Sequence, residues 1–185
     1  MRSGGTGDLK KVLLVLFLLL AALGSTDCHA VTPDQHYVES IAAYAVRVKN
    51  QGLFPSVALA QSCWETGFGK SLDNLDISGY PIRQYNNVLG KKWRFGNYFE
   101  KMTIEGAGAA QVKVVRKFQV YGSLEECFDD YARNIQKNPA YKDKDTSNPE
   151  AFIRSIARHY ATVNPDVYAS GIIRIIKKYN LTKYD

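Results

Sequence analysis

The sequence predicts a mainly helical α+β domain in which helices flank one small β-hairpin lobe, with a cleft between the two parts. Three observations predict this class. Amphipathic segments that begin with capping residues lie on either side of the middle of the chain, and a β-branched run of alternating polarity lies between them. In addition, 45% of the 185 residues are hydrophobic, which is enough to form a core.

Two helices are expected after residue 30. Thr32-Pro33-Asp34-Gln35 forms a capping box with proline at the first helical position, and the helix is predicted to run to about Asn50 and to end at Gly52. Its apolar residues recur on one face: Val38, Ile41, Ala42, Ala45 and Val48. The segment Ser56–Thr66 is nearly all apolar or small and is followed by Gly67, so it predicts a buried helix.

A β-hairpin is expected in the middle of the chain. Glycine and proline break any long period between Lys70 and Gly108, which favours loops and short strands there. Hydrophobic and polar residues then alternate over a β-branched run that contains Val112, Val114 and Phe118. The alternation predicts a strand that pairs back across a glycine-rich turn at Gly106–Gly108.

Three helices are predicted to follow the hairpin. Ser123-Leu124-Glu125-Glu126 is a second capping box, Asn148-Pro149 caps the next helix, and the last helix spans roughly Asp166 to Tyr179. The residues expected to face inward are Leu124, Cys127, Phe128, Tyr131 and Ile135 in the first, Phe152, Ile153, Ile156, Ala157 and Tyr160 in the second, and Tyr168, Ile172, Ile175 and Ile176 in the third.

Residues 1–30 have the pattern of a signal peptide. Lys10 and Lys11 precede an apolar run, Val12–Leu23, and Cys28-His29-Ala30 forms a small-x-small cleavage site before Val31. The run is short against the ~20 residues that a membrane-spanning helix needs. We therefore expect cleavage after residue 30, export to the periplasm or cell envelope, and a domain from 31 to 185 without a stable membrane anchor. A retained anchor and a lipoprotein attached at Cys28 are the alternatives.

Charge, cysteine and histidine usage narrow the classes of partner. Removal of the leader takes away three basic and two acidic residues, so the formal charge falls from +6 to +5. In an exported monomer such a basic surface serves an anionic wall or membrane more often than nucleic acid, and it also serves solubility. Cys63 and Cys127 remain, and an oxidising compartment would permit them to pair. His36 and His159 lack metal-ligand spacing, so neither a metal nor a cofactor is expected.

Glu65 is the strongest candidate for chemistry on local grounds. It lies in the last turn of the apolar helix, between Trp64 and Phe68 and two residues before Gly67. Burial and the negative end of the helix both disfavour the ionised carboxylate, so the pKa of Glu65 should be raised, as a general acid requires. The alternative is a glutamate that extends into solvent at a helix end.

Four blocks carry a resemblance to a known family. The segment Ser56–Ser71, which contains Leu-Ala-Gln-Ser-Cys-Trp-Glu-Thr-Gly-Phe-Gly-Lys-Ser, resembles the catalytic helix of the glucosaminidase family, glycoside hydrolase family 73, of the form Leu-Ala-Gln-Ala-x-x-Glu-[Ser/Thr]-Gly-Trp-Gly-Lys-Ser. Asn86-Asn87-Val88-Leu89-Gly90-Lys91-Lys92 resembles its Asn-Asn-Leu-Phe-Gly-Ile-Lys. Phe118–Glu126 and the pair Tyr160-Ala161-Thr162 and Tyr168-Ala169 resemble two further blocks in the family's order.

The resemblance implies a lysozyme-like fold and an endo-β-N-acetylglucosaminidase that cleaves the β-1,4 glycosidic bonds of peptidoglycan glycan strands. Glu65 stands where the family has its general acid, and Tyr160 where it has a tyrosine beside that acid. Thr103-Ile104-Glu105-Gly106 resembles the segment that carries the second carboxylate, so Glu105 is expected to be catalytic. Glu100, in the same lobe, is the rival.

The resemblance also implies substrate-binding residues. Asn86 and Asn87 match a turn at the cleft floor, where their amides would bind sugar substituents or form Asx-turns. Phe68 replaces the family's usual tryptophan and keeps an aromatic ring there, and Tyr168 belongs to the last matching block. The segment 72–85 is longer than the family's connection, and 160–168 has two extra residues, so Asp166 does not inherit the aspartate of that block.

Other functional classes remain open from the sequence. Ser62-Cys63-Trp64 is similar to the nucleophile segment of papain-like cysteine peptidases, although Gln61 is too close to the cysteine and His159 has no evident orienting partner. A non-catalytic wall-binding module would also have an aromatic cleft. A muramidase or a lytic transglycosylase would share the fold and cleave a different bond.

Overall fold

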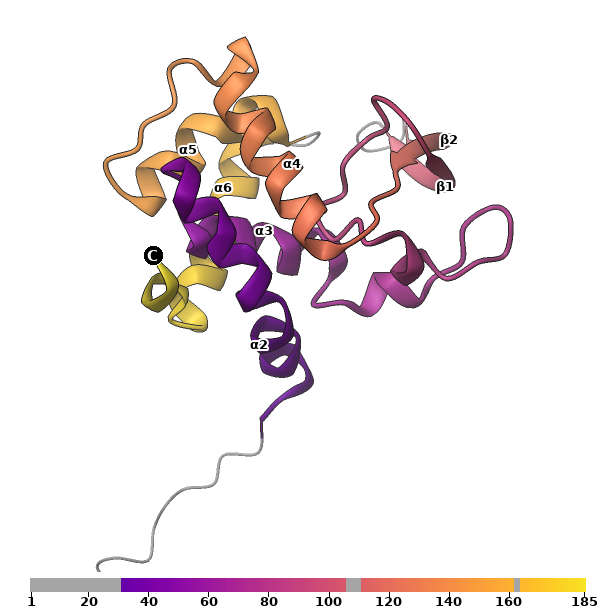
Figure 1. The fold of residues 1–185 in the computed structure, drawn as a ribbon, viewed down its shortest axis with the longest axis horizontal. Coiled ribbons are helices and arrows are strands. Elements are labelled where there is room, and N and C mark those ends of the chain that lie inside the picture. The colour runs from indigo at the N-terminus through magenta and orange to yellow at the C-terminus, as the bar shows by residue number, and fades with distance from the viewer. Residues whose placement is uncertain (1–30, 106–110, 162–163) are drawn as a thin grey trace, which may run out of the picture. The chain divides into compact units, whose positions relative to one another are not determined.

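The computed structural model describes residues 31–105, 111–161 and 164–185. The expected leader (1–30), the turn Gly106–Gly108 and Thr162 lie outside these residues. The described part of the unit Thr32–Asp185 forms five α-helices and one antiparallel hairpin (Figure 1). The elements are α2 (Pro33–Ala45), α3 (Pro55–Thr66), β1 (Tyr98–Glu105), β2 (Val112–Gln119), α4 (Leu124–Lys137), α5 (Pro149–Tyr160) and α6 (Pro165–Lys178). The predicted mainly helical α+β class, with one hairpin lobe, is confirmed.

The helices begin at the residues that the capping signals predicted. The side chains of Thr32, Ser123 and Asn148 each accept a hydrogen bond from the backbone N–H three residues later, which satisfies one of the free donors of the first turn. Asn164 caps α6 by accepting from the N–H groups of Asp166 and Val167, and no cap was predicted for this helix. The first helix ends at Ala45 and continues as a 3₁₀-helix, Val46–Gln51, so its predicted end near Asn50 is the end of the combined segment.

Helix α3 forms the centre of the helical part. Ten of its twelve residues are buried, and it contacts α2, α5 and α6 (Figure 1). The two exceptions are Trp64 and Glu65 in the last turn, which are exposed. Gly67 ends the helix with φ 57°, a left-handed conformation that glycine adopts without steric cost. A helix that is otherwise core thus delivers one carboxylate to the surface.

The hairpin has a register that sorts its side chains into two faces. Tyr98 pairs with Gln119 and Glu105 pairs with Val112, with no bulge between them. Because side chains alternate along a strand, Phe99, Lys101, Thr103 and Glu105 share one face of β1 and Glu100 lies on the other. Phe99 is buried and stacks on Tyr85 and Phe118, which fixes the first face against the rest of the domain.

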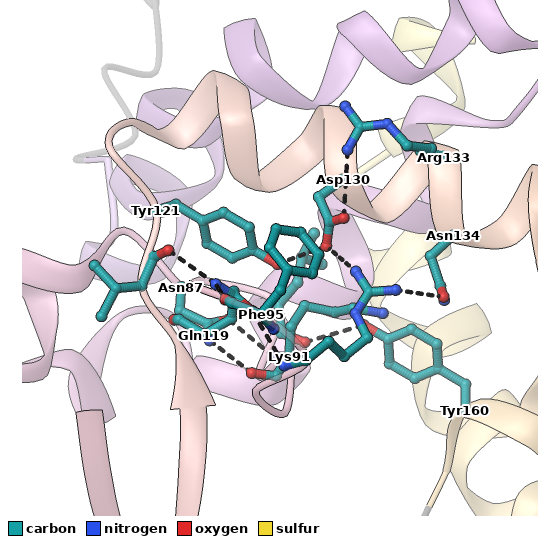
Figure 2. Close-up of polar contacts among 12 residues, drawn as sticks. Asn87, Lys91, Phe95, Gln119, Tyr121, Asp130, Arg133, Asn134 and Tyr160 are labelled. Carbon is teal, nitrogen blue, oxygen red and sulfur yellow. Dashed lines mark hydrogen bonds and ion pairs between the residues drawn. The ribbon is translucent and has the colours of Figure 1, made fainter. Parts of the chain in front are cut away.

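A polar network connects the hairpin lobe to helix α4. The buried carboxylate of Asp130 accepts hydrogen bonds from Arg94 Nη2 at 2.5 Å and from the Tyr121 hydroxyl at 2.7 Å, and it also forms an ion pair with Arg133 (Figure 2). Gln119, also buried, donates to the carbonyl of Phe95. Such a network resists separation of the lobe from α4, because the loss of a partner would leave the Asp130 carboxylate buried without compensation.

The remaining segments agree with the expected loops. Residues 70–97 contain two 3₁₀-helices, Lys70–Asp73 and Ile82–Tyr85, and isolated bridges join Leu75 to Pro81 and Lys92 to Phe118. Cys63 and Cys127 are both buried and do not form a disulfide with each other. Among the helices of residues 31–105, 111–161 and 164–185, none combines the length and the apolar composition that a membrane span requires.

Candidate active site

An open cavity of about 600 Å³ lies where the end of α3 meets the hairpin lobe. Its walls come from the end of α3, the turn Leu89–Lys92, the end of β1, and helices α5 and α6. Four of the predicted site residues line this one cavity: Glu65, Glu105, Tyr160 and Tyr168. Segments far apart in the sequence therefore converge on the helix end that carries Glu65.

Glu65 is closely confined on the side of the turn that contains Gly90. A Cβ atom placed on Gly90 would lie 3.0 Å from Glu65 Oε2, closer than nearly all real contacts. Gly90 also has φ 61°, a conformation that other residues rarely adopt. Another residue at this position would strain the turn and push the Glu65 carboxyl group aside, so glycine suits both.

A chain of buried hydrogen bonds holds the other oxygen of Glu65. The Tyr131 hydroxyl donates to Gln61 Oε1 at 2.7 Å, Gln61 Nε2 donates to the Tyr168 oxygen at 2.9 Å, and the Tyr168 hydroxyl donates to Glu65 Oε1 at 3.1 Å. With the Gln61 amide in this orientation, the hydroxyl proton of Tyr168 points at Glu65. Oε1 is then an acceptor, and a proton on Glu65 resides on Oε2. Gln61 and Tyr131 position the acid without touching the cavity.

The pKa of Glu65 is raised, in the direction expected from its place in the sequence. Burial by the surrounding walls is the largest cause, although the residue stays exposed to the cavity. The hydrogen bond from Tyr168 and the positive charges of Lys91 and Lys101 act in the opposite direction, and burial outweighs them. The carboxyl group therefore keeps its proton to a higher pH than an ordinary glutamate.

Tyr160 lies beside Glu65, but its hydroxyl serves the backbone. It donates to the carbonyl of Leu89 at 3.0 Å, and its ring stacks on Tyr168 at 6.0 Å. Burial is the largest reason that the pKa of Tyr160 is raised, so the phenol stays neutral. In this structure Tyr160 fixes the turn before Gly90 and supports Tyr168.

Glu105 has the opposite electrostatic environment. Its two oxygens accept hydrogen bonds from Arg116 at 2.8 and 2.6 Å, and Lys92 lies 3.6 Å away. The Arg116 hydrogen bonds, and the charges of Arg116 and Lys92, lower the pKa of Glu105 to about 2, so it is ionised at neutral pH. Glu100, on the other face of β1, does not line this cavity.

The structure places the three other predicted binding residues away from the large cavity. The amide of Asn87 donates to the carbonyls of Lys91 and Gln119 and accepts from the Lys91 N–H, so it shapes the turn. Asn86 has φ 53° and donates to the Tyr121 carbonyl. Phe68 packs against Tyr179 with ring centroids 5.2 Å apart. Sugar binding by these residues stays a prediction, whereas their contacts in the protein are structural.

Trp64 lines the cavity and was missed as a site residue. It is 41% exposed and packs edge-on to Tyr168. A Cβ on Gly171 would lie 2.1 Å from the Trp64 ring, so glycine makes room for the indole on α6. Its place directly before a candidate acid was a usable signal in the sequence, but the apolar run around it gave no sign that this aromatic residue is exposed.

The cysteine-nucleophile alternative does not fit the geometry. Cys63 is completely buried, and burial raises the pKa of its thiol to about 12. A reactive cysteine needs an accessible thiolate. His159 lines the cavity, but its ring packs against Tyr141 and its Nε2 accepts a hydrogen bond from Arg158.

Comparisons with known proteins find similar sequences over most of this chain. A family model described as mannosyl-glycoprotein endo-beta-N-acetylglucosaminidase matches residues 34–181. The chain is 29% identical over 147 residues to a peptidoglycan hydrolase FlgJ of Vibrio parahaemolyticus, covering 78% of this chain and 47% of that protein. It is 31% identical over 166 residues to a probable N-acetylmuramidase of Lactococcus lactis, covering 84% and 36%. The chain spans less than two thirds of the length of either relative.

Solved structures give the same picture of the fold. A peptidoglycan hydrolase from Sphingomonas sp. A1 is similar with a TM-score of 0.64 and 26% identity, covering 81% of this chain and 92% of that one. The catalytic domain of the autolysin Auto from Listeria monocytogenes has a TM-score of 0.65 at 24% identity, with full coverage of both chains. This second likeness concerns the fold alone.

The hydrogen-bond chain makes a prediction about the ionisation of Glu65. Tyr168→Phe removes a donor to the carboxylate, so the pKa of Glu65, measured by carboxyl ¹³C NMR titration, should rise. Tyr141→Phe is the matched control, because its hydroxyl donates to the His159 carbonyl and not to Glu65. An unchanged or lower pKa of Glu65 in Tyr168→Phe would contradict the assignment of the Tyr168 hydroxyl as the donor to Glu65.

Proposed function

This chain belongs to the glucosaminidase family of glycoside hydrolases, and on that premise we propose that it is an exported endo-β-N-acetylglucosaminidase of peptidoglycan with Glu65 as general acid. The observation that carries the proposal is the environment of Glu65. A carboxyl group with a raised pKa faces an open cavity, and the chain through Tyr168 leaves its proton on Oε2. Donation of that proton to a glycosidic oxygen allows the bond from this oxygen to the sugar C1 to break.

The second carboxylate has a different role in the proposal. Ionised Glu105 lies in the wall of the same cavity and would stabilise the positive charge that develops on the sugar ring. Its low pKa and its Arg116 partner make it a poor general base as it stands. Activation of a water, or assistance to attack by the substrate's own N-acetyl group, requires the Glu105–Arg116 pair to open. No covalent glycosyl-enzyme is expected.

Export belongs to the same proposal. Peptidoglycan lies outside the cytoplasm, and residues 1–30 have the pattern of a cleaved signal peptide. The mature domain from 31 to 185 would act as a monomer, without metal, cofactor, nucleic acid or stable membrane anchor.

An N-acetylmuramidase is the second candidate function. The specific reason is the 31% identity to a probable N-acetylmuramidase over most of this chain. Both reactions use an acid at the same place in a cleft, and they differ in which sugar occupies the site next to it.

The variant Glu65→Gln tests the proposed general acid directly. This change removes the proton donor and keeps the shape, so the variant should fold normally and lose at least about 10²-fold in the rate of sacculus hydrolysis. Turbidity clearing and circular dichroism check the two halves of the statement. Substantial activity in the folded variant would remove Glu65 from the proposed role.

The products distinguish the two candidate functions. Purified sacculi digested by the protein should release fragments that end in reducing N-acetylglucosamine, which borohydride reduction and mass spectrometry identify. Reducing N-acetylmuramic acid would select the muramidase, and its 1,6-anhydro form would select a lytic transglycosylase.

The two carboxylates of β1 provide a matched pair of variants. Glu105→Gln should lose most of its activity but not all, because the charge that faces the cavity is removed while the acid remains. Glu100→Gln should keep most activity, since Glu100 lies on the other face of the strand. If kcat falls mainly in Glu100→Gln, the second carboxylate has been assigned to the wrong face.

A further inference from the structure

Lys91 places a positive charge in the wall of the cavity next to the candidate acid. It follows Gly90 in the turn that confines Glu65, and it lines the cavity together with Glu65 and Tyr160. Its Nζ lies 5.2 Å from the centroid of the Tyr160 ring, and Figure 2 shows the two side chains near each other. Asn87 holds both the N–H and the carbonyl of Lys91, so the backbone from which the side chain projects is fixed.

Lys91 differs from the other long cationic side chains that line the cavity. Lys92 is paired with Glu105 at 3.6 Å, and Arg94 is paired with Asp130 at 2.5 Å. No carboxylate of the described residues forms an ion pair with Lys91. The residue is half-buried, and burial lowers the pKa of its ammonium group to about 8, which leaves it mostly charged at neutral pH. The protein thus bears the cost of a partly desolvated charge without a counter-ion of its own.

The side chain of Lys91 takes no part in the hydrogen bonds that shape its own turn. The Asn87 amide makes these bonds to the N–H and the carbonyl of Lys91, and no hydrogen bond among the described residues uses Lys91 Nζ. The fold of this turn therefore does not require a cation there. A charge placed in the cavity wall instead of an apolar side chain changes what the cavity can bind.

We propose that Lys91 binds a carboxylate of the glycan substrate, and that this chain is selective for acidic muramyl strands over the same strands without charge. The inference rests on the function proposed above. A muramyl residue carries a lactyl group whose carboxyl is either free or joined to a peptide that contains carboxylates. Both sources offer the same chemistry to an ammonium group in a partly water-excluded site, where an ion pair with hydrogen bonding is stronger than in bulk water.

Four substrates and three variants test the proposal. The substrates are peptide-free strands and peptide-bearing strands, each used as isolated and after its carboxyl groups have been converted to amides. The wild type should lose roughly tenfold in kcat/KM when the carboxylates are amidated, mainly through KM. Lys91→Ile should be about tenfold weaker on the native strands and indifferent to amidation. Lys91→Arg should keep the preference, and Lys113→Ile, which removes an exposed charge outside the cavity, should match the wild type.

The outcomes separate the possible sources of the carboxylate. A preference with peptide-free strands assigns the lactyl carboxylate, and a preference confined to peptide-bearing strands assigns the peptide. An equal loss of activity on native and amidated strands in Lys91→Ile would overturn the proposal, because Lys91 would then act through Glu65. A wild type indifferent to amidation would overturn it as well.

Binding provides a readout that does not depend on turnover. In calorimetry, the inactive Glu65→Gln variant should bind native strands about tenfold more tightly than amidated strands. The double variant Glu65→Gln/Lys91→Ile should bind both kinds of strand with the same Kd. If the wild type cleaves none of the strands, the proposed function fails while this measurement still decides the role of Lys91. Equal Kd values for native and amidated strands would count against Lys91 alone.

Discussion

The burial of helix α3 is the constraint on which the rest of the site depends. A helix surrounded by other helices has little freedom to rotate or slide, because each of its buried side chains occupies a fitted space in the core. Glu65 inherits that rigidity through its place in the last turn. Gln61, one turn earlier on the same helix, is a polar residue in this core and must find partners there. Tyr131 and Tyr168 supply them, and the second continues the chain to Glu65. The requirement to satisfy one buried amide therefore also orients the acid.

The two carboxylates of the cavity show how position sets ionisation. Glu65 gains its raised pKa mainly from walls that remove water, while Glu105 is held ionised by a bidentate arginine at the end of a strand. Pairs of acidic groups whose environments push their pKa values apart are typical of acid–base assignments in glycosidases. In this chain the difference comes from the architecture, since one residue is carried by a core helix and the other by a two-stranded hairpin.

Much of this arrangement was predictable from the sequence, because its signals are local. Capping residues and the period of the apolar positions placed five helices, and alternation placed one hairpin, within a few residues of their ends. Glu65 was visible as a charge in an apolar helix. The features that were not predicted depend on tertiary contacts. Asn87 donates hydrogen bonds to the carbonyls of two different segments, and Asp130 accepts hydrogen bonds from Arg94 and Tyr121 of the hairpin lobe. Lys91 lines a cavity. No pattern along the chain indicates which side chains meet after folding. Lys91 differs from its neighbours only through such contacts, because Lys92 and Arg94 form ion pairs with carboxylates and Lys91 does not.

The contact between Trp64 and Gly171 has a consequence for how this domain can change over time. The indole lies so close to the backbone of α6 that even the methyl group of an alanine at 171 would overlap it. A larger residue at 171 therefore requires the indole to swing away from α6 or a smaller residue to replace the tryptophan, whereas the tryptophan can be lost first without a clash. Positions 64 and 171 lie on separate helices and are coupled through this one contact, so a substitution at either changes what the other can be. The aromatic wall beside the acid thus depends on a glycine that a different helix contributes.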